Sequence, residues 1–310
     1  MPPEAAALLA VVGPTASGKT QAGIQIAGVL GAEIVSVDSM LIYRGMDIGT
    51  AKPTAEDQRR VRHHLLDLAD PSESFSVARY QVFTNRVLGD LQGGQRRPLL
   101  VGGSGLYFRA CVDDLQFPST DPNVRADLQR QADALGAARL HQRLQDLDPV
   151  AAGKIEPGNV RRTIRALEVA GLTGRPFSSF AKAWECYPPE RVRAAGIEID
   201  RRVLEDRIAR RVDEMVRSGW ISEVTRLVQA GFGSWLTATQ AIGYAELTRH
   251  LEGELTLEEA IALTVKRTKQ LARRQLAWFR RDPRIRWFPA GEGGATDAVD
   301  DIVRYLESAG

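Results

Sequence analysis

Cysteine is scarce in this chain of 310 residues, and neither sign of charge predominates. The two cysteines, Cys111 and Cys186, provide neither a disulfide framework nor the spacing of a zinc site, which favours a protein of the reducing cytoplasm. Lysine and arginine total 41 against 39 acidic residues, so the net charge of +2 does not by itself indicate a nucleic-acid partner. A site for a polyanion must come from local clustering of basic residues.

Long apolar runs are also missing. The opening MPPEAAALLAVVG has no basic region, and its apolar run from Ala5 to Val12 is too short to span a bilayer. We therefore expect a first β-strand here and a cytoplasmic protein without a membrane partner. The sequence also lacks a heptad seam, so we expect a monomer.

Strand-like and helix-like stretches alternate in the first third of the chain. ALLAVVG, AEIVSVD and RRPLLVGGSG have the character of buried strands, whereas SVARYQVFTNRVLGDLQGG has helical spacing and closes at Gly93. This alternation predicts an α/β fold with a parallel sheet flanked by helices on both faces.

The pattern changes after Asp113, where helical periodicity continues without a buried strand. We predict an inserted all-helical domain over residues 114–198. The chain returns to the sheet near residue 200 with AAGIEID, and the remainder is predicted to be helical. The core domain would then comprise residues 1–113 and 199–310.

The segment GPTASGKT matches the phosphate-binding pattern G-x-x-x-x-G-K-[ST] and lies between an expected strand and an expected helix. This context predicts a P-loop NTPase-like core. Backbone N–H groups would bind phosphate, the Lys19 ammonium would add a positive charge, and the Thr20 hydroxyl would reach Mg²⁺. The predicted diphosphate- or nucleotide-binding residues are Gly13, Pro14, Thr15, Ala16, Ser17, Gly18, Lys19 and Thr20.

The acid that normally holds magnesium in phosphate-hydrolysing enzymes is missing after PLLVGGSG, which ends in glycines and Ser104. Asp38, at the end of EIVSVD, is the acid placed at the carboxyl end of a core strand, where open α/β sheets bind ligands. Three interpretations remain open from position alone: Asp38 turns the chain, carries a metal, or acts as a general base.

Several blocks together resemble the tRNA dimethylallyltransferases, bacterial isopentenyltransferases that modify adenosine 37. These blocks run in family order from about residue 8 to residue 288: GPTASGKT, VDSMLIYRGMDIGTAKP, HHLLDLADPSESFSVARY, PLLVGGSGLYFRA, RRTIRALEV, AIGYAEL and VKRTKQLARRQLAWFRRD.

The resemblance implies transfer of a dimethylallyl group from dimethylallyl diphosphate to N6 of that adenosine, with Mg²⁺ as cofactor and diphosphate as the leaving group. It implies that Asp38 is the base, that the Ser104 hydroxyl, where the family usually has Thr, contacts substrate, and that Arg211 accompanies the diphosphate. On sequence alone, Arg211 fits a solvated charge on an amphipathic helix equally well. Many relatives have Gln in place of Leu41.

The resemblance also implies that the anticodon stem-loop of tRNA binds to blocks in both predicted domains, and that adenine leaves the stack to reach Asp38. Nine basic residues between Lys266 and Arg286 are opposed in that segment by Asp282 alone. Core packing is the alternative interpretation of Trp278. The implied tRNA-binding residues are Asp38, Ser39, Met40, Leu41, Ser104, Arg125, Arg161, Arg162, Thr163, Ile164, Arg165, Gln240, Ala241, Ile242, Gly243, Tyr244, Ala245, Arg273, Arg274, Gln275, Leu276, Ala277, Trp278, Phe279 and Arg280.

Three alternative functions share some of these features. An isopentenyltransferase acting on free adenine nucleotides would not need the helical insertion or the basic C-terminal segment. A small-molecule kinase is suggested by the phosphate loop, and an RNA-binding module would retain that loop without using it.

Overall fold

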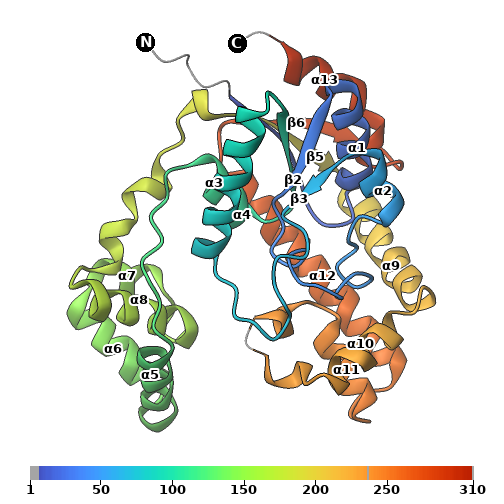
Figure 1. Ribbon diagram of the computed structural model, residues 1–310. Coiled ribbons are helices and arrows are strands. Elements are labelled where there is room, and N and C mark those ends of the chain that lie inside the picture. The colour runs from blue at the N-terminus through green and yellow to red at the C-terminus, as the bar shows by residue number, and fades with distance from the viewer. Residues whose placement is uncertain (1–6, 236, 309–310) are drawn as a thin grey trace. The chain divides into compact units, whose positions relative to one another are not determined.

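The computed structural model describes residues 7–235 and 237–308 (Figure 1). The chain divides into two compact units. Unit 1 comprises Met1–Asp113 and Pro188–Gly310, and unit 2 comprises Asp114–Tyr187. The predicted core reaches residues 1 and 310, and both of these ends lie outside the described residues.

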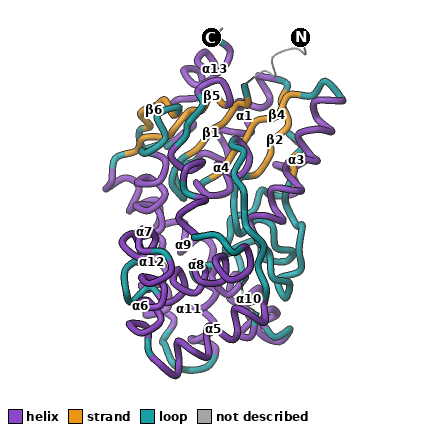
Figure 2. Tube along the Cα trace, turned by 90° about the vertical axis from the view of Figure 1, so that its left-hand side faces the viewer, coloured by secondary structure: helices purple, strands orange, loops and turns teal. Residues whose placement is uncertain are grey.

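Unit 1 is built on a six-stranded sheet in the order β3-β2-β4-β1-β5-β6, with every pairing parallel. In Figure 2 the strands from β6 through β5, β1 and β4 to β2 lie side by side. The parallel sheet confirms the predicted α/β class. The strands are β1 (Leu8–Val12), β2 (Ala32–Ser36), β3 (His63–His64), β4 (Arg97–Gly102), β5 (Val192–Ile199) and β6 (Ile285–Ala290).

Both faces of the sheet are buried. Leu9 and Val11 point into an apolar core shared with α1 (Lys19–Leu30) and α13 (Val299–Glu307), whereas Ala10 between them is fully buried on the opposite face. Burial on both faces explains why the central strands are continuous apolar runs without polar alternation.

The helices of unit 1 agree with the predicted alternation, and α3 ends at Gly93 as expected. The helices are α1 (Lys19–Leu30), α2 (Ala55–Arg60), α3 (Val77–Gly93), α4 (Gly105–Val112), α9 (Arg201–Arg217), α10 (Trp220–Gln229), α11 (Tyr244–Leu251), α12 (Leu257–Phe279) and α13 (Val299–Glu307).

The prediction of an entirely helical C-terminal part was wrong, because β6 pairs in parallel with β5 at the sheet edge. Pro289 and the exposed Arg286 obscure the strand pattern in the sequence, yet an edge strand tolerates both, since one of its sides needs no hydrogen-bond donors. The two-residue strand β3 gave too short a signal to be predicted.

All regular secondary structure in the described residues of unit 2 is helical, and the unit has its own apolar core, which includes Leu128, Leu144 and Leu167. It begins where the insertion was predicted to begin but ends before the predicted residue 198, because β5 lies in the sheet of unit 1. Its α-helices are α5 (Pro122–Leu135), α6 (Ala137–Leu147), α7 (Pro149–Lys154) and α8 (Val160–Thr173).

Within the described ranges, no helix is long and apolar enough to cross a membrane.

Candidate active site

The predicted phosphate loop connects β1 to α1, as expected from its pattern. Two of its residues have left-handed backbone conformations, Ala16 with φ 63° and Gly18 with φ 85°. The Ser17 hydroxyl is fully buried and finds no hydrogen-bond partner among the described residues. An unpartnered buried donor at a helix N-terminus suits an anionic ligand.

Lys19 places its ammonium group inside this loop, where Nζ donates to the Pro14 carbonyl at 3.1 Å. The pKa of Lys19 is lowered to about 8, chiefly by burial; the charge of Arg211 also lowers it, and the charge of Asp38 partly offsets both effects. A phosphate group would stabilise the protonated form.

Asp38 lies just beyond β2, and its Oδ1 accepts a hydrogen bond from the Met40 backbone at 2.9 Å. This contact supports the interpretation of Asp38 as a turn residue, yet the side chain also lines a cavity. The two observations are compatible, since a carboxylate with one oxygen fixed by the backbone retains a second oxygen for a ligand.

Glycine is required where β4 approaches Asp38. A methyl group at Gly102 would overlap the Val37 carbonyl oxygen, and this close approach lets Ser104 N donate to the same oxygen at 3.2 Å. Ser104 precedes α4, and its side chain makes no capping hydrogen bond. The hydroxyl is therefore not committed to holding the helix end.

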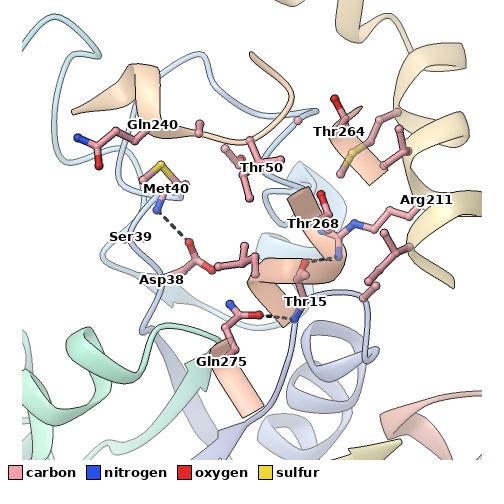
Figure 3. A pocket seen from close by; sticks show the side chains of 18 of the residues that line it. Thr15, Asp38, Ser39, Met40, Thr50, Arg211, Gln240, Thr264, Thr268 and Gln275 are labelled. Atoms are coloured by element: carbon pink, nitrogen blue, oxygen red, sulfur yellow. Dashed lines mark hydrogen bonds between the residues drawn. The ribbon is translucent and has the colours of Figure 1, made fainter. Parts of the chain in front are cut away.

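A cavity of about 230 Å³ is lined by the phosphate loop, the stretch after β2 and α9, whereas Ser104 does not line it. Figure 3 shows Thr15 between Asp38 and Arg211. Arg211, on α9, has NH1 3.5 Å from the Thr15 hydroxyl, and burial lowers its pKa. The predicted residues that line the cavity are Thr15, Ala16, Asp38, Ser39, Met40, Arg211, Gln240, Ala241, Ile242, Arg274 and Gln275.

The rest of the cavity wall was not predicted from the sequence. Ile208, Val212 and Met215 recur with Arg211 at helical spacing on α9, which was the available signal. Thr264 and Thr268 lie about one turn apart on α12. Gly49 and Thr50 lie within the block VDSMLIYRGMDIGTAKP but were not singled out, and Trp220 and Leu271 had no local signal.

A second, more open cavity of about 950 Å³ borders the phosphate loop and shares Ala16, Arg211 and Met215 with the first. Its lining includes Lys19 and Thr20 from the start of α1. No group of three His, Cys, Asp or Glu residues suited to a metal occurs in the described part of the chain. A magnesium ion here would be held by Thr20 together with the ligand's phosphate oxygens and water, an arrangement that Mg²⁺ commonly adopts.

Gln275 links the basic helix α12 to the phosphate loop, because its Oε1 accepts from Thr15 N at 2.8 Å (Figure 3). Arg274 beside it lines the cavity, whereas Arg273 lies 3.7 Å from Glu205 and Arg280 lies 3.3 Å from Glu198.

The remaining implied tRNA-binding residues of α12 differ in exposure. Leu276 packs against an apolar cluster, Phe279 is buried, and Trp278 packs so closely on Gly105 that a methyl group there would overlap its ring. The core interpretation of Trp278 thus has structural support, while Ala277 is exposed.

The cavity-lining stretch of residues 240–242 is followed directly by Gly243 and then by α11, which begins with Tyr244 and Ala245. The Tyr244 side chain is fully buried. Leu41 lies one residue beyond the stretch of Asp38 to Met40 that lines the cavity.

In unit 2, Arg125 and Arg165 each form a 2.8 Å ion pair with the buried Glu168, and Arg165 also donates to two backbone carbonyls. Thr163 and Ile164 are buried in this unit, with 0% and 4% of their residue surface exposed. Arg161 and Arg162 are exposed.

Comparisons with known proteins agree with these features. The model of the IPP transferase family matches residues 41–282. The tRNA dimethylallyltransferase of Desulforudis audaxviator is 47% identical over 302 residues, which cover 97% of each protein.

Solved structures are similar across nearly the whole chain. The full-length tRNA isopentenylpyrophosphate transferase of Bacillus halodurans has a TM-score of 0.69 and 40% identity, with 97% of both chains covered. A eukaryotic dimethylallyltransferase acting on tRNA shares the fold with a TM-score of 0.76 at 22% identity, covering 93% of this chain and 74% of that one.

Proposed function

The chain belongs to the IPP transferase family, and we infer that it is a transferase that attaches a dimethylallyl group to tRNA. We further propose that dimethylallyl diphosphate is the donor and N6 of adenosine 37 the acceptor, with release of diphosphate. The observation that carries this proposal is that Thr15 of the phosphate loop, Asp38 and Arg211 line one cavity.

The donor half of the reaction needs a holder for the leaving group. Breaking the allylic C–O bond places negative charge on the diphosphate, and fixed donors that face this charge accelerate the step. The loop N–H groups, the unpartnered Ser17 hydroxyl, Lys19 and Arg211 are the donors that we assign to it.

The acceptor half needs a base, because the adenine amino group is a weak nucleophile whose lone pair is delocalised into the ring. We assign Asp38 to this role. Met40 N holds one of its oxygens, so the other is oriented toward the proton that leaves N6 as the new C–N bond forms. Adenine must be extruded from the anticodon loop to reach this cavity, which costs on the order of a few kcal/mol.

Magnesium would be held by Thr20 together with the diphosphate and water, where it would neutralise charge on the leaving group. Ser104 is assigned to a hydrogen bond with substrate.

We propose that the exposed cations Arg274, Arg161 and Arg162 bind the RNA, with the anticodon stem-loop as the bound part of the tRNA. We also propose that the enzyme acts as a monomer in the cytoplasm.

A transfer assay with labelled dimethylallyl diphosphate and an unmodified tRNA bearing adenosine 37 tests this function. Asp38→Asn is the sharpest variant, because the amide keeps the oxygen that accepts from Met40 N but loses the base. We expect transfer to fall by about 10²–10⁴-fold with RNA binding retained. Equal transfer to AMP, or transfer of phosphate from ATP without a prenyl donor, would sink the proposal.

A further inference from the structure

Glu223 on α10 is a buried carboxylate whose hydrogen-bond partners are neutral groups. Only 2% of the surface of Glu223 is exposed. Oε2 accepts from Asp47 N at 3.0 Å and Ile48 N at 2.9 Å, while Oε1 accepts from Gly49 N at 3.3 Å and from the Tyr244 hydroxyl at 2.6 Å. Three consecutive backbone N–H groups thus converge on one carboxylate, as in an anion nest.

The two sets of partners are the backbone amides of residues 47–49 and the hydroxyl of Tyr244, which lie far apart in the sequence. Both belong to segments that line the same cavity. Gly49 and Thr50 line it directly, and Asp47 and Ile48 line the second cavity beside the phosphate loop. Tyr244 begins α11 and follows Gln240 to Ile242, which also line the first cavity. Glu223 therefore ties together two segments of its wall.

Trp220 reinforces this connection one turn earlier on α10. Methyl groups at Gly49 or Gly243 would each overlap its indole, and the ring packs edge-on against Tyr244 with centroids 5.6 Å apart. Because the Trp220 ring is in contact with both glycines, it fills the space between the segment of Gly49 and the segment of Gly243. The distance between these two segments is therefore set by α10.

We propose that Glu223 is a positioning residue of the prenyl transfer: it holds residues 47–49 and Tyr244 in register, so that the acceptor base meets Asp38 at the correct distance from the diphosphate. The inference rests on the proposed function, since it assigns adenine and diphosphate to this cavity. A shift of about 1 Å in such a wall is enough to cost on the order of 10²-fold in rate.

The first test compares Glu223→Gln with wild type. Glutamine has the same shape, but its NH₂ group cannot accept from the backbone N–H groups, so part of the nest is lost. We expect kcat for tRNA prenylation to fall about 30- to 100-fold. We expect KM for dimethylallyl diphosphate to change less than about threefold, because the phosphate loop is untouched.

Two further variants distinguish positioning from simple stability. Tyr244→Phe keeps the ring against Trp220 and removes one of the four hydrogen bonds, so an intermediate loss of about fivefold in kcat is expected.

The matched control is Glu33→Gln. Glu33 is a part-buried carboxylate on β2 that contacts His64 and Arg96, and its substitution is expected to lower Tm but keep kcat. If Glu223→Gln does not fold, Tyr244→Phe decides. A kcat loss no larger than in the control at equal Tm loss would overturn the proposal.

Amide hydrogen exchange tests the positioning role of Glu223 independently of the proposed prenyl transfer. The amides of residues 47–49 should exchange faster in Glu223→Gln than in wild type, whatever the enzyme transfers, and unchanged exchange would contradict the geometry. A wild-type protein that transfers no prenyl group to tRNA would instead refute the proposed function while leaving this exchange result in place.

Discussion

Lys19 illustrates how burial at a single residue shapes the chemistry of the site. Because burial lowers its pKa to about 8, the ammonium group is mostly protonated at pH 7 and loses its proton within reach of ordinary assays. A bound diphosphate favours the protonated form, so the pKa of Lys19 rises on binding. Affinity for diphosphate must therefore fall as pH increases through about 8.

We predict that titration calorimetry with inorganic diphosphate between pH 7 and 9.5 will show this loss, approaching tenfold per pH unit above pH 8. Diphosphate itself gains charge over the same range, so Lys19→Met provides the baseline. The ratio of the two affinities should decline with pH, and parallel curves would contradict the role assigned to Lys19.

At the residue scale, the sequence singled out some cavity residues through a local signal and missed others that had none. The phosphate loop and Asp38 were identified because each directly follows a buried strand, and parallel strands end at one edge of the sheet. Glu223 was missed because its partners are backbone amides some 175 positions away, which leave no mark in the sequence around it.

At the scale of elements, α12 has two kinds of cation that the sequence could not distinguish. The Lys266–Arg286 segment looks uniformly basic, but Arg267 pairs with the buried Glu246, and Lys269 pairs with Glu205. These acids come from α11 and α9, so the charge count within the segment overstated what is free for RNA. Arg274 lines the cavity instead.

This difference predicts opposite consequences for two arginines of the same helix. Arg274→Gln should weaken RNA binding and lower the slope of log Kd against log salt by about one, because a phosphate contact is lost. Arg267→Gln should keep that slope and instead cost about 1–3 kcal/mol of stability, since it leaves Glu246 without its cation. Fluorescence anisotropy over a salt series and thermal unfolding measure the two effects, and identical behaviour of both variants would refute the distinction.

At the scale of the whole molecule, the sheet of unit 1 and the return of the chain to it after the insertion were predictable, but the place of the returning strand in the sheet was not. Strand β5 lies after unit 2 in the chain and pairs with β1 in parallel, although nothing in its apolar run reveals that register. A buried ion-pair network marks the place where the chain leaves and re-enters unit 1. Arg284 contacts Asp113 at 2.8 Å and the Pro188 carbonyl at 3.5 Å, and Asp113 also pairs with Arg109.

Because one guanidinium reaches both Asp113 and Pro188, the two ends of unit 1 at the insertion are close enough for a short link. We therefore predict that replacing residues 114–187 with a few Gly and Ser residues leaves unit 1 folded, since the sheet and its apolar core lie entirely within it. Diphosphate affinity should remain within about threefold of wild type, while tRNA affinity falls by at least tenfold as the contacts proposed for unit 2 are lost.

Circular dichroism measures whether the shortened protein is folded, calorimetry measures its affinity for diphosphate, and fluorescence anisotropy measures its affinity for tRNA. Full tRNA affinity in the shortened protein would place the whole RNA grip on unit 1, and loss of diphosphate binding would mean that the loop depends on the insertion.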